Sequence, residues 1–409
     1  MPSFKVGART VGDGSPVFIV AELSANHGHS LDVALATVDA AADAGADAIK
    51  IQTYTPDTLT LPFDRDPFIV RTNNEWAGKT LHALYADAMT PWEWTAALKT
   101  RAEARGLVFF STPFDPTAVD FLEAQGVGLY KVASFELVDL PLVDYVARTG
   151  KPMIMSTGMA TFAEIERAVR AARSVGNDRL ALLRCVSCYP AKSEDMNLAA
   201  IAELKTLGTV VGLSDHTRET EVAIAAVALG AKVVEKHFIR DRALGGPDAF
   251  FSLEPKEFKE LVRAIRACET AIGSARFGPT PAEAKSVAFR RSLFVTADLK
   301  AGEIFTAKNV RSMRPSNGLA PEQLPRVLGA IARADVAAGT PLSEAHVGER
   351  VAPSGRVQAV LDAAAKAQAP IARVTTSDAT FLAELERAGF YHFHETKDGV
   401  ACERRVASY

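Results

Sequence analysis

The chain has 409 residues, 46 basic and 49 acidic side chains, and a formal net charge of −3. This length favours one large domain with one or two smaller ones, and the near-neutral charge argues against nucleic acid or a membrane surface as the main partner. No apolar run approaches the ~18 residues of a membrane span and the N-terminus lacks an apolar signal core, so we expect a cytoplasmic protein. Four cysteines are too few for a disulfide framework, which predicts free thiols.

Eight apolar, β-branched runs recur in the first two thirds of the chain, separated by helix-like segments that end at glycine. The runs are VFIVAE (17–22), DAIKIQT (47–53), LVFFST (107–112), LYKVASF (129–135), PMIMST (152–157), LALLRCVS (180–187), VVGLSD (210–215) and KVVEKHF (232–238). Capping boxes at Thr90 with Glu93 and at Thr161 with Glu164 indicate two helix starts. This pattern predicts a (β/α)8 TIM barrel over residues 1–276.

The segment between Gln52 and Leu107 is much longer than an ordinary strand-to-helix connection. In a barrel it would lie over the active face, so we expect a lid. Trp76, Trp92 and Trp94 lie in and beside it, and packing is the expected role of such residues, with Trp76 the best candidate for contact with a ligand.

Three further pieces follow the barrel. Residues 277–289 resemble a linker, and residues 290–349 have short strand-like runs between glycine and proline turns, typical of a compact, mostly β module. Residues 350–409 form a small α/β extension. Its expected elements are the helices VQAVLDAAAKAQ and TFLAELERAGF and the strands PIARVTT, YHFHET and ACERRV, the last two joined at an Asp398-Gly399 turn.

Active groups of a barrel lie at the carboxyl ends of its strands, and here those ends are polar. Lys50 and Lys131 lie inside strand runs, where a buried ammonium is costly unless an anion compensates it. Lysines and hydroxyls together predict a site for phosphate and carboxylate groups: Lys50, Thr112, Lys131, Ser134, Ser156 and Ser214. For any one of these residues alone, a snorkelling lysine or a hydroxyl bonded to its own backbone is the favoured explanation, but their occurrence on successive strand ends favours the anion site.

His216 and His237 end neighbouring strands, so their rings could meet on one divalent ion. Two ligands leave an open shell for water, substrate or a carboxylate such as Glu22, and the alternative is a pair of core histidines. The Cys185/Cys188 pair has redox or zinc spacing without a second pair, so ordinary barrel packing is favoured. His392 and His394 are expected on a solvated hairpin face.

The motifs AELSANH, GADAIKIQT, FFSTPFD, YKVAS, MSTGMA, VGLSDHT and EKHF follow the order found in the sialic acid synthase family, which the chain resembles from about Val17 to Val347. Members condense phosphoenolpyruvate with an amino-sugar aldehyde to give nonulosonic acids, which implies a transferase that forms a carbon–carbon bond. The β module, including MRPSNG, resembles the family's C-terminal antifreeze-like (SAF) domain. The resemblance implies a domain-swapped homodimer in which this domain covers the partner's barrel.

The resemblance also implies residue roles. Lys50, Thr112, Lys131, Ser134, Ser156 and Ser214 would hold phosphoenolpyruvate, and Gln52, Glu136, Tyr189, Asp248 and Arg314 the sugar. His216 and His237 would hold Mn²⁺ or Mg²⁺, which polarises the sugar aldehyde. Glu22 would orient the aldehyde or move a proton.

Within the family, ELSANH, YTPDTLTL, WAGKTLHALY and GGPDAFFSLEP are more similar to pseudaminic acid synthases than to N-acetylneuraminate synthases. This implies 2,4-diacetamido-2,4,6-trideoxy-altrose as co-substrate. The alternatives are an N-acetylneuraminate or legionaminate synthase, a barrel aldolase that uses Lys131 as a Schiff base, and a sugar-binding protein with an inactive barrel. The tail after Gly348 departs from the family pattern and suggests no role.

Overall fold

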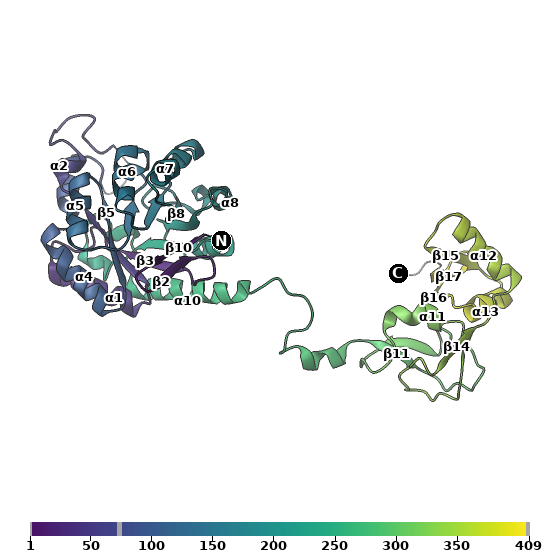
Figure 1. Ribbon diagram of the computed structural model, residues 1–409. Coiled ribbons are helices and arrows are strands. Elements are labelled where there is room, and N and C mark those ends of the chain that lie inside the picture. Colours follow the sequence, from purple (N-terminus) through teal and green to yellow (C-terminus); the bar gives the residue numbers. More distant parts are fainter. Residues whose placement is uncertain (1, 72–75, 406–409) are drawn as a thin grey trace. The chain divides into compact units, whose positions relative to one another are not determined.

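The computed structural model describes residues 2–71 and 76–405, so residues 72–75 of the expected lid lie outside it. The chain divides into two compact units, Met1–Ser274 and Ala275–Tyr409. Figure 1 shows the first unit in purple to teal and the second in green to yellow. Each unit is described by itself.

The first unit is a closed barrel of eight parallel strands, and the TIM-barrel prediction is confirmed. The ring closes where β10 pairs with β3, with His237 opposite Glu22. The barrel strands are β3 (Phe18–Glu22), β4 (Ala48–Thr53), β5 (Val108–Pro113), β6 (Tyr130–Val132), β7 (Met153–Ser156), β8 (Leu180–Cys185), β9 (Val210–Asp215) and β10 (Val233–His237). Each coincides with one of the eight apolar runs.

Helices surround the barrel (Figure 1). They are α1 (Leu31–Asp43), α4 (Thr95–Ala104), α5 (Pro116–Ala124), α6 (Leu140–Arg148), α7 (Phe162–Ser174), α8 (Ala200–Lys205), α9 (Glu221–Ala228) and α10 (Pro255–Ile272). The capping box of Thr161 and Glu164 is formed at α7. The one predicted at Thr90 is wrong, because Pro91, which has no side-chain acceptor, caps a 3-10 turn at Trp92–Trp94 and leaves the buried Thr90 hydroxyl without a partner among the described residues.

An N-terminal hairpin, absent from the elements expected from the sequence, closes one end of the barrel. It consists of β1 (Ser3–Val6) and β2 (Arg9–Gly12). Its buried apolar side chains join one cluster with the inward-facing residues of the first half of each strand, including Phe4, Val6, Val11, Phe18, Val20, Ala48, Leu129 and Val233. Side chains alternate along a strand, so the inward residues two positions further on lie above this apolar floor.

The lid segment (54–91) lies between β4 and α4 and contains the short helices α2 (Pro56–Leu59) and α3 (Leu81–Ala88). Trp92 Nε1 donates a hydrogen bond to Tyr54 O at 3.0 Å, and Trp94 packs against the helix-side core, so both are packing residues as predicted. Trp76 Nε1 donates to Pro247 O at 2.9 Å. The lid segment therefore contacts the segment that follows β10.

The second unit has a β module followed by an α/β extension. The module contains β11 (Ser292–Val295) paired with β12 (Val310–Met313), β13 (Ala330–Ala332) paired with β14 (Val347–Arg350), and α11 (Leu324–Val327). The extension contains α12 (Gly355–Lys366), β15 (Ile371–Thr376), α13 (Ala379–Arg387), β16 (Tyr391–Thr396) and β17 (Gly399–Arg405), in a sheet of order β15-β17-β16. The two helices and three strands expected from the sequence are all present.

Guanidinium groups of two partly buried arginines donate hydrogen bonds to backbone carbonyls where the module meets the extension. Arg350 Nη2 donates to Leu328 O at 2.9 Å and to Ala388 O at 3.2 Å, and Arg404 Nη1 donates to Ala388 O at 2.7 Å. The backbones approach so closely at Gly389 that a Cβ there would lie 2.5 Å from Leu328 O. The extension is therefore fixed on the module.

Gly389→Ala tests this junction, with Gly339→Ala as its control. The two glycines have φ values of +84° and +85°, but nothing lies within 4 Å of a Cβ at Gly339. Alanine at either site costs about 1–2 kcal/mol of backbone strain, and only position 389 adds a clash worth about 1–3 kcal/mol. Hydrogen exchange of the Val351 amide, which donates to Gly329 O, should accelerate more in Gly389→Ala; equal rates in the two variants would contradict a close-packed junction.

Candidate active site

Two lysines and two glutamates form a buried ion cluster inside the barrel. Lys50 Nζ lies 2.8 Å from Glu22 Oε2 and 3.5 Å from Glu235 Oε1, and Lys131 Nζ lies 2.7 Å from Glu235 Oε1. None of the four residues is more than 4% exposed. They follow the inward-facing floor residues of β3, β4, β6 and β10 by two positions, which directs them into the barrel.

Burial and mutual attraction set the charges of this cluster. Burial raises the pKa of the Glu235 carboxyl, but the charges of Lys131 and Lys50 outweigh burial and lower that pKa to about 2. Burial raises the pKa of Glu22 and the attraction of Lys50 offsets this only in part. Glu235 is thus a fixed anion, and Glu22 is the carboxyl suited to carry a proton.

Hydroxyl groups lie around the ion cluster. Lys50 Nζ donates to Thr112 Oγ1 at 3.1 Å, and Ser214 Oγ donates to Glu235 Oε1 at 3.3 Å. The amide of Gly158 donates to Ser134 Oγ at 3.1 Å. The predicted phosphate-binding residues Lys50, Thr112, Lys131 and Ser214 are therefore brought together.

Two buried hydroxyls of this region have no hydrogen-bond partner among the described residues. They are Ser156 Oγ and Ser187 Oγ. A Cβ at Gly158 would lie 2.3 Å from Ser187 Oγ and 2.8 Å from Ser134 Oγ, so glycine is required for this close approach. Buried donors without a partner cost free energy, and a bound anion would satisfy them.

The histidine pair lies at the carboxyl ends of β9 and β10. The ring centroids of His216 and His237 are 5.3 Å apart. His216 Nδ1 donates to Val186 O at 2.8 Å, so the neutral form of this ring presents Nε2 as an acceptor. His237 Nδ1 is buried without a hydrogen-bond partner among the described residues and lies 3.6 Å from Asp248 Oδ2. Burial, followed by the charge of His216, lowers the pKa of His237 and keeps its imidazole neutral.

This donor set fits a divalent cation, since neutral imidazoles are metal ligands. Within residues 2–71 and 76–405 no group of three or more His, Cys, Asp or Glu side chains is arranged to hold a metal ion. A cation held by the two histidines alone would therefore need water or substrate oxygens to complete its coordination shell.

Aromatic rings form the mouth above the histidines. The Tyr189 ring lies 4.5 Å from that of His216 and 5.3 Å from that of Trp76, and Trp76 lies 6.3 Å from Phe250. Trp76 comes from the lid segment, Tyr189 follows β8, and Phe250 follows β10. The lid segment thus contributes directly to the wall of the site, as expected for Trp76.

The predicted sugar-binding residues are only partly gathered here. Gln52 Nε2 donates to Glu22 Oε1 at 3.2 Å, and Asp248 Oδ2 accepts from the Ala25 amide at 3.5 Å. Glu136 lies on a 3-10 turn after β6, where burial raises the pKa of its carboxyl to about 7. Arg314 is exposed and belongs to the second unit, so it is not among the barrel residues of the site.

Three residues of the site were missed as functional candidates. Glu235 ends a strand run and Ser187 follows β8, and neither residue is among the predicted site residues. Cys185 is a buried free thiol on β8, consistent with the predicted barrel packing, and its Sγ lies 4.0 Å from His216 Nδ1. Ala181, Leu183 and Cys185 alternate along β8, and this period of two could have predicted that the Cys185 side chain faces the barrel interior.

Lys236 holds the turn after β9 from the outer side of the barrel. Its Nζ donates to Asp215 Oδ2 at 2.7 Å, to Glu219 O at 3.3 Å and to Thr217 O. Asp215 precedes His216 and Lys236 precedes His237. The Lys236–Asp215 pair is therefore a positioning element for both histidines.

Family models match most of the chain. The NeuB family model matches residues 37–277 and the SAF domain model residues 290–348. The chain belongs to the NeuB family. Two similar relatives are the pseudaminic acid synthases of Campylobacter jejuni (44% identical over 329 residues, 80% of this chain and 96% of the relative) and Helicobacter pylori (43% identical over 331 residues, 80% and 97%).

Solved structures of similar proteins agree with the fold. The N-acetylneuraminic acid synthetase of Leptospira borgpetersenii is 34% identical, with a TM-score of 0.62 over 70% of this chain and 95% of that one. The spore coat polysaccharide biosynthesis protein of Bacillus subtilis is 34% identical, with a TM-score of 0.58 over 85% and 100%. The predicted family and SAF domain are confirmed, and this NeuB-family chain is a phosphoenolpyruvate-dependent nonulosonate synthase, a transferase.

The four cysteines are free thiols, as predicted. In the described ranges, no helix combines the length and apolar character needed to cross a membrane.

The positioning role of Lys236 is tested by Lys236→Met combined with Asp215→Asn, because removing Lys236 alone would strand a buried carboxylate at about 3–5 kcal/mol. The double variant should fold, release phosphate from phosphoenolpyruvate about 10- to 100-fold more slowly in kcat with little change in KM, and bind Mn²⁺ more weakly. Steady-state kinetics and metal titration measure this. Lys232→Met, on the same strand segment, is the control; an unchanged kcat in the double variant would exclude a positioning role.

The raised pKa of Glu136 predicts a pH-dependent stability. Between pH 4.5 and 7 the folded carboxyl keeps a proton that the unfolded chain releases, so the free energy of unfolding falls as pH rises. The full difference is about 3 kcal/mol. Urea unfolding across this range should therefore give a flatter profile for Glu136→Gln than for the wild type. The control Glu93→Gln, at an exposed position, should not alter the slope of unfolding free energy against pH. Parallel profiles for the wild type and Glu136→Gln would contradict the raised pKa.

Proposed function

We propose that the chain is a pseudaminic acid synthase, which condenses phosphoenolpyruvate with 2,4-diacetamido-2,4,6-trideoxy-altrose to form a nonulosonic acid and phosphate. The observation that carries the proposal is the 44% identity, over 329 residues, to a relative with that activity in its name. The buried ion cluster and its unpaired hydroxyls supply the chemistry that the reaction requires.

In the proposal, phosphoenolpyruvate lies over the ion cluster. Lys50 and Lys131 attract its negative groups, and Thr112, Ser134, Ser156 and Ser214 donate hydrogen bonds. Ser187, whose hydroxyl has no partner among the described residues, joins this set. Glu235 holds both ammonium groups in place before the substrate arrives, so little reorganisation accompanies binding.

We also assign a divalent cation, Mn²⁺ or Mg²⁺, to His216 and His237. When bound, the ion would act as a Lewis acid on the sugar's aldehyde oxygen. The open nitrogen of His216 and the neutral imidazole of His237 support the assignment. Lys236 and Asp215 would keep the two rings in their orientation.

The remaining chemistry falls to groups of the chain. C3 of phosphoenolpyruvate attacks the aldehyde carbon, a carbon–carbon bond forms, and the aldehyde oxygen takes a proton. Glu22, whose burial raises its pKa, is the proton carrier within reach of this position. Water then adds at C2, and the tetrahedral intermediate expels phosphate by cleavage of the C–O bond. Lys50 and Lys131 stabilise the negative charge of the departing phosphate.

The sugar would occupy the mouth of the barrel. Gln52, Glu136, Tyr189 and Asp248 offer polar contacts there, and Trp76 and Phe250 form an apolar wall for the deoxy methyl and acetamido groups. Arg314 completes the site in the proposal, supplied by a partner subunit in a domain-swapped homodimer. Its position inside the SAF match supports this role. The free thiols support a cytoplasmic location.

A second candidate is a legionaminic acid synthase. The N,N'-diacetyllegionaminic acid synthase of Campylobacter jejuni is 37% identical over 321 residues. The ion cluster and histidine pair would serve either sugar, so the wall of Trp76, Tyr189 and Phe250 is where the two activities would differ.

Phosphate release with Mn²⁺ distinguishes these activities. The altrose-configured diacetamido sugar, N-acetylmannosamine and a manno-configured diacetamido sugar are compared side by side at equal concentration. The first should be preferred by a factor of about 100 or more in kcat/KM, because a misplaced hydroxyl leaves buried polar groups unpaired. Preference for another sugar would retain the reaction and refute the pseudaminate assignment.

Two controls accompany this assay. His237→Ala and chelation of the metal should each abolish release, and added Mn²⁺ should restore only the chelated wild type. If metal-loaded protein releases no phosphate with any of the three sugars, the sugar-binding alternative would be favoured. Mass-spectrometric detection of a borohydride-trapped adduct at Lys131 would instead identify a Schiff-base aldolase.

A further inference from the structure

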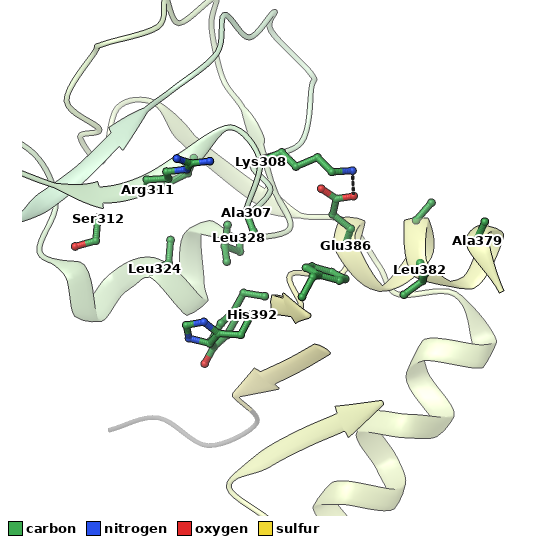
Figure 2. A pocket seen from close by; sticks show the side chains of 14 residues that line it. Ala307, Lys308, Arg311, Ser312, Leu324, Leu328, Ala379, Leu382, Glu386 and His392 are labelled. Atoms are coloured by element: carbon green, nitrogen blue, oxygen red, sulfur yellow. Dashed lines mark hydrogen bonds and ion pairs between the residues drawn. The ribbon is translucent and has the colours of Figure 1, made fainter. Parts of the chain in front are cut away.

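We propose that a groove between the SAF module and the C-terminal extension is a second, non-catalytic binding site for a small sugar acid, of the class of the reaction's nine-carbon product. The identity of the acid rests on the proposed function. The groove has a volume of about 730 Å³, within the usual range for ligand sites. Figure 2 shows its lining side chains, with Lys308, Arg311 and Leu324 from the module and Glu386 and His392 from the extension.

The extension supplies half of this groove. The lining residues of α13 and β16 lie between positions 379 and 393, whereas the SAF match ends at residue 348. The Campylobacter jejuni relative is matched over 96% of its own length by only 80% of this chain. One wall of the groove therefore lies within the SAF match and the other lies beyond the residues that either family model matches, and none of the lining residues belongs to the ion cluster or the histidine pair.

The groove is preformed. Arg350 and Arg404 fix the backbone at Leu328 and Ala388. Lys308 Nζ and Glu386 Oε2 form an ion pair of 2.7 Å from one wall to the other, drawn as a dashed line in Figure 2. A ligand would find the walls already in place, which lowers the entropy cost of binding.

The lining combines an apolar floor with one uncompensated charge. Leu324, Leu328 and Leu382 line the groove, and the charge of Lys308 is neutralised by Glu386. The Arg311 guanidinium has no hydrogen-bond or ion-pair partner in the described part of the chain, residues 2–71 and 76–405. Guanidinium groups bind carboxylates through two parallel hydrogen bonds.

A strained residue of the extension also lines the groove. His392 has a φ of +55°, and the register of β16 with β17 shifts between Tyr391 and His394. Such a conformation costs about 1–3 kcal/mol for a residue other than glycine and is concentrated at ligand sites. The bulge therefore brings an imidazole, together with Phe393, to the groove instead of continuing a regular strand.

Charge and shape select the ligand class. One unpaired guanidinium balances a monoanion, and it does not balance the charges of a nucleotide or a phosphorylated sugar. The product has a single carboxylate beside acetamido methyls and a terminal methyl, which match the leucine floor. The proposed ligand is therefore the acid sugar. Inorganic phosphate tests whether the groove is a simple anion site.

Calorimetric titration of the full chain with purified pseudaminic acid tests the proposal. The wild type is compared with three variants. Arg311→Gln removes the guanidinium, and Leu382→Glu places a negative charge in the floor that repels the carboxylate of the ligand. Arg373→Gln, at an exposed arginine of β15 outside the groove, is the control. Arg311→Gln and Leu382→Glu should weaken one class of site at least 10-fold, and Arg373→Gln should not. The methyl ester of the acid should not bind this site.

Three outcomes would overturn the proposal. They are superimposable isotherms for the wild type and Arg311→Gln, equal binding of the methyl ester, and displacement of the acid by equimolar phosphate. Phosphate release from the altrose-configured sugar is measured for the same proteins and should be unchanged in Arg311→Gln. A wild type that fails to turn over this sugar would refute the proposed function, whereas the groove is judged by its own isotherm.

Discussion

The pairing of Lys50 and Lys131 with Glu22 and Glu235 is the interaction on which the rest of the barrel site depends. Four charges in a buried position are tolerated only because each ammonium has a carboxylate within 2.8 Å, and loss of one partner would strand the others at a cost of about 3–5 kcal/mol. The cluster follows from a simple repeat, since Val20, Ala48, Leu129 and Val233 lie two residues earlier and face the same interior.

The inner and outer faces of β10 carry residues with different roles. Glu235 and His237 face inward, toward the ion cluster and the histidine pair, while Lys236 between them faces outward and binds the turn that carries His216. One three-residue stretch therefore supplies an anion, a positioning cation and an imidazole. Substituting any of the three changes the site through a different physical route.

Strand positions and inward polar residues could be predicted from the sequence because both follow local periodicity. The partners of those residues could not, since Lys131 and Glu235 are 104 positions apart and meet only when the barrel closes. The contact of Cys185 with His216 was not predictable for the same reason, and the Thr90 capping box failed because Pro91 displaced the start of the turn. The N-terminal hairpin was missed because its short strands pack on a floor that exists only after folding.

The N-terminal hairpin closes one end of the barrel, so the site is reached from the opposite end. Phe4, Val6 and Val11 close the far end, so anything that reaches Lys50 and Lys131 must pass the ring of Trp76, Tyr189 and Phe250. In the proposed reaction, a sugar at the mouth would cover phosphoenolpyruvate bound at the bottom. Phosphoenolpyruvate would then enter before the sugar, and phosphate would leave only after the mouth had cleared.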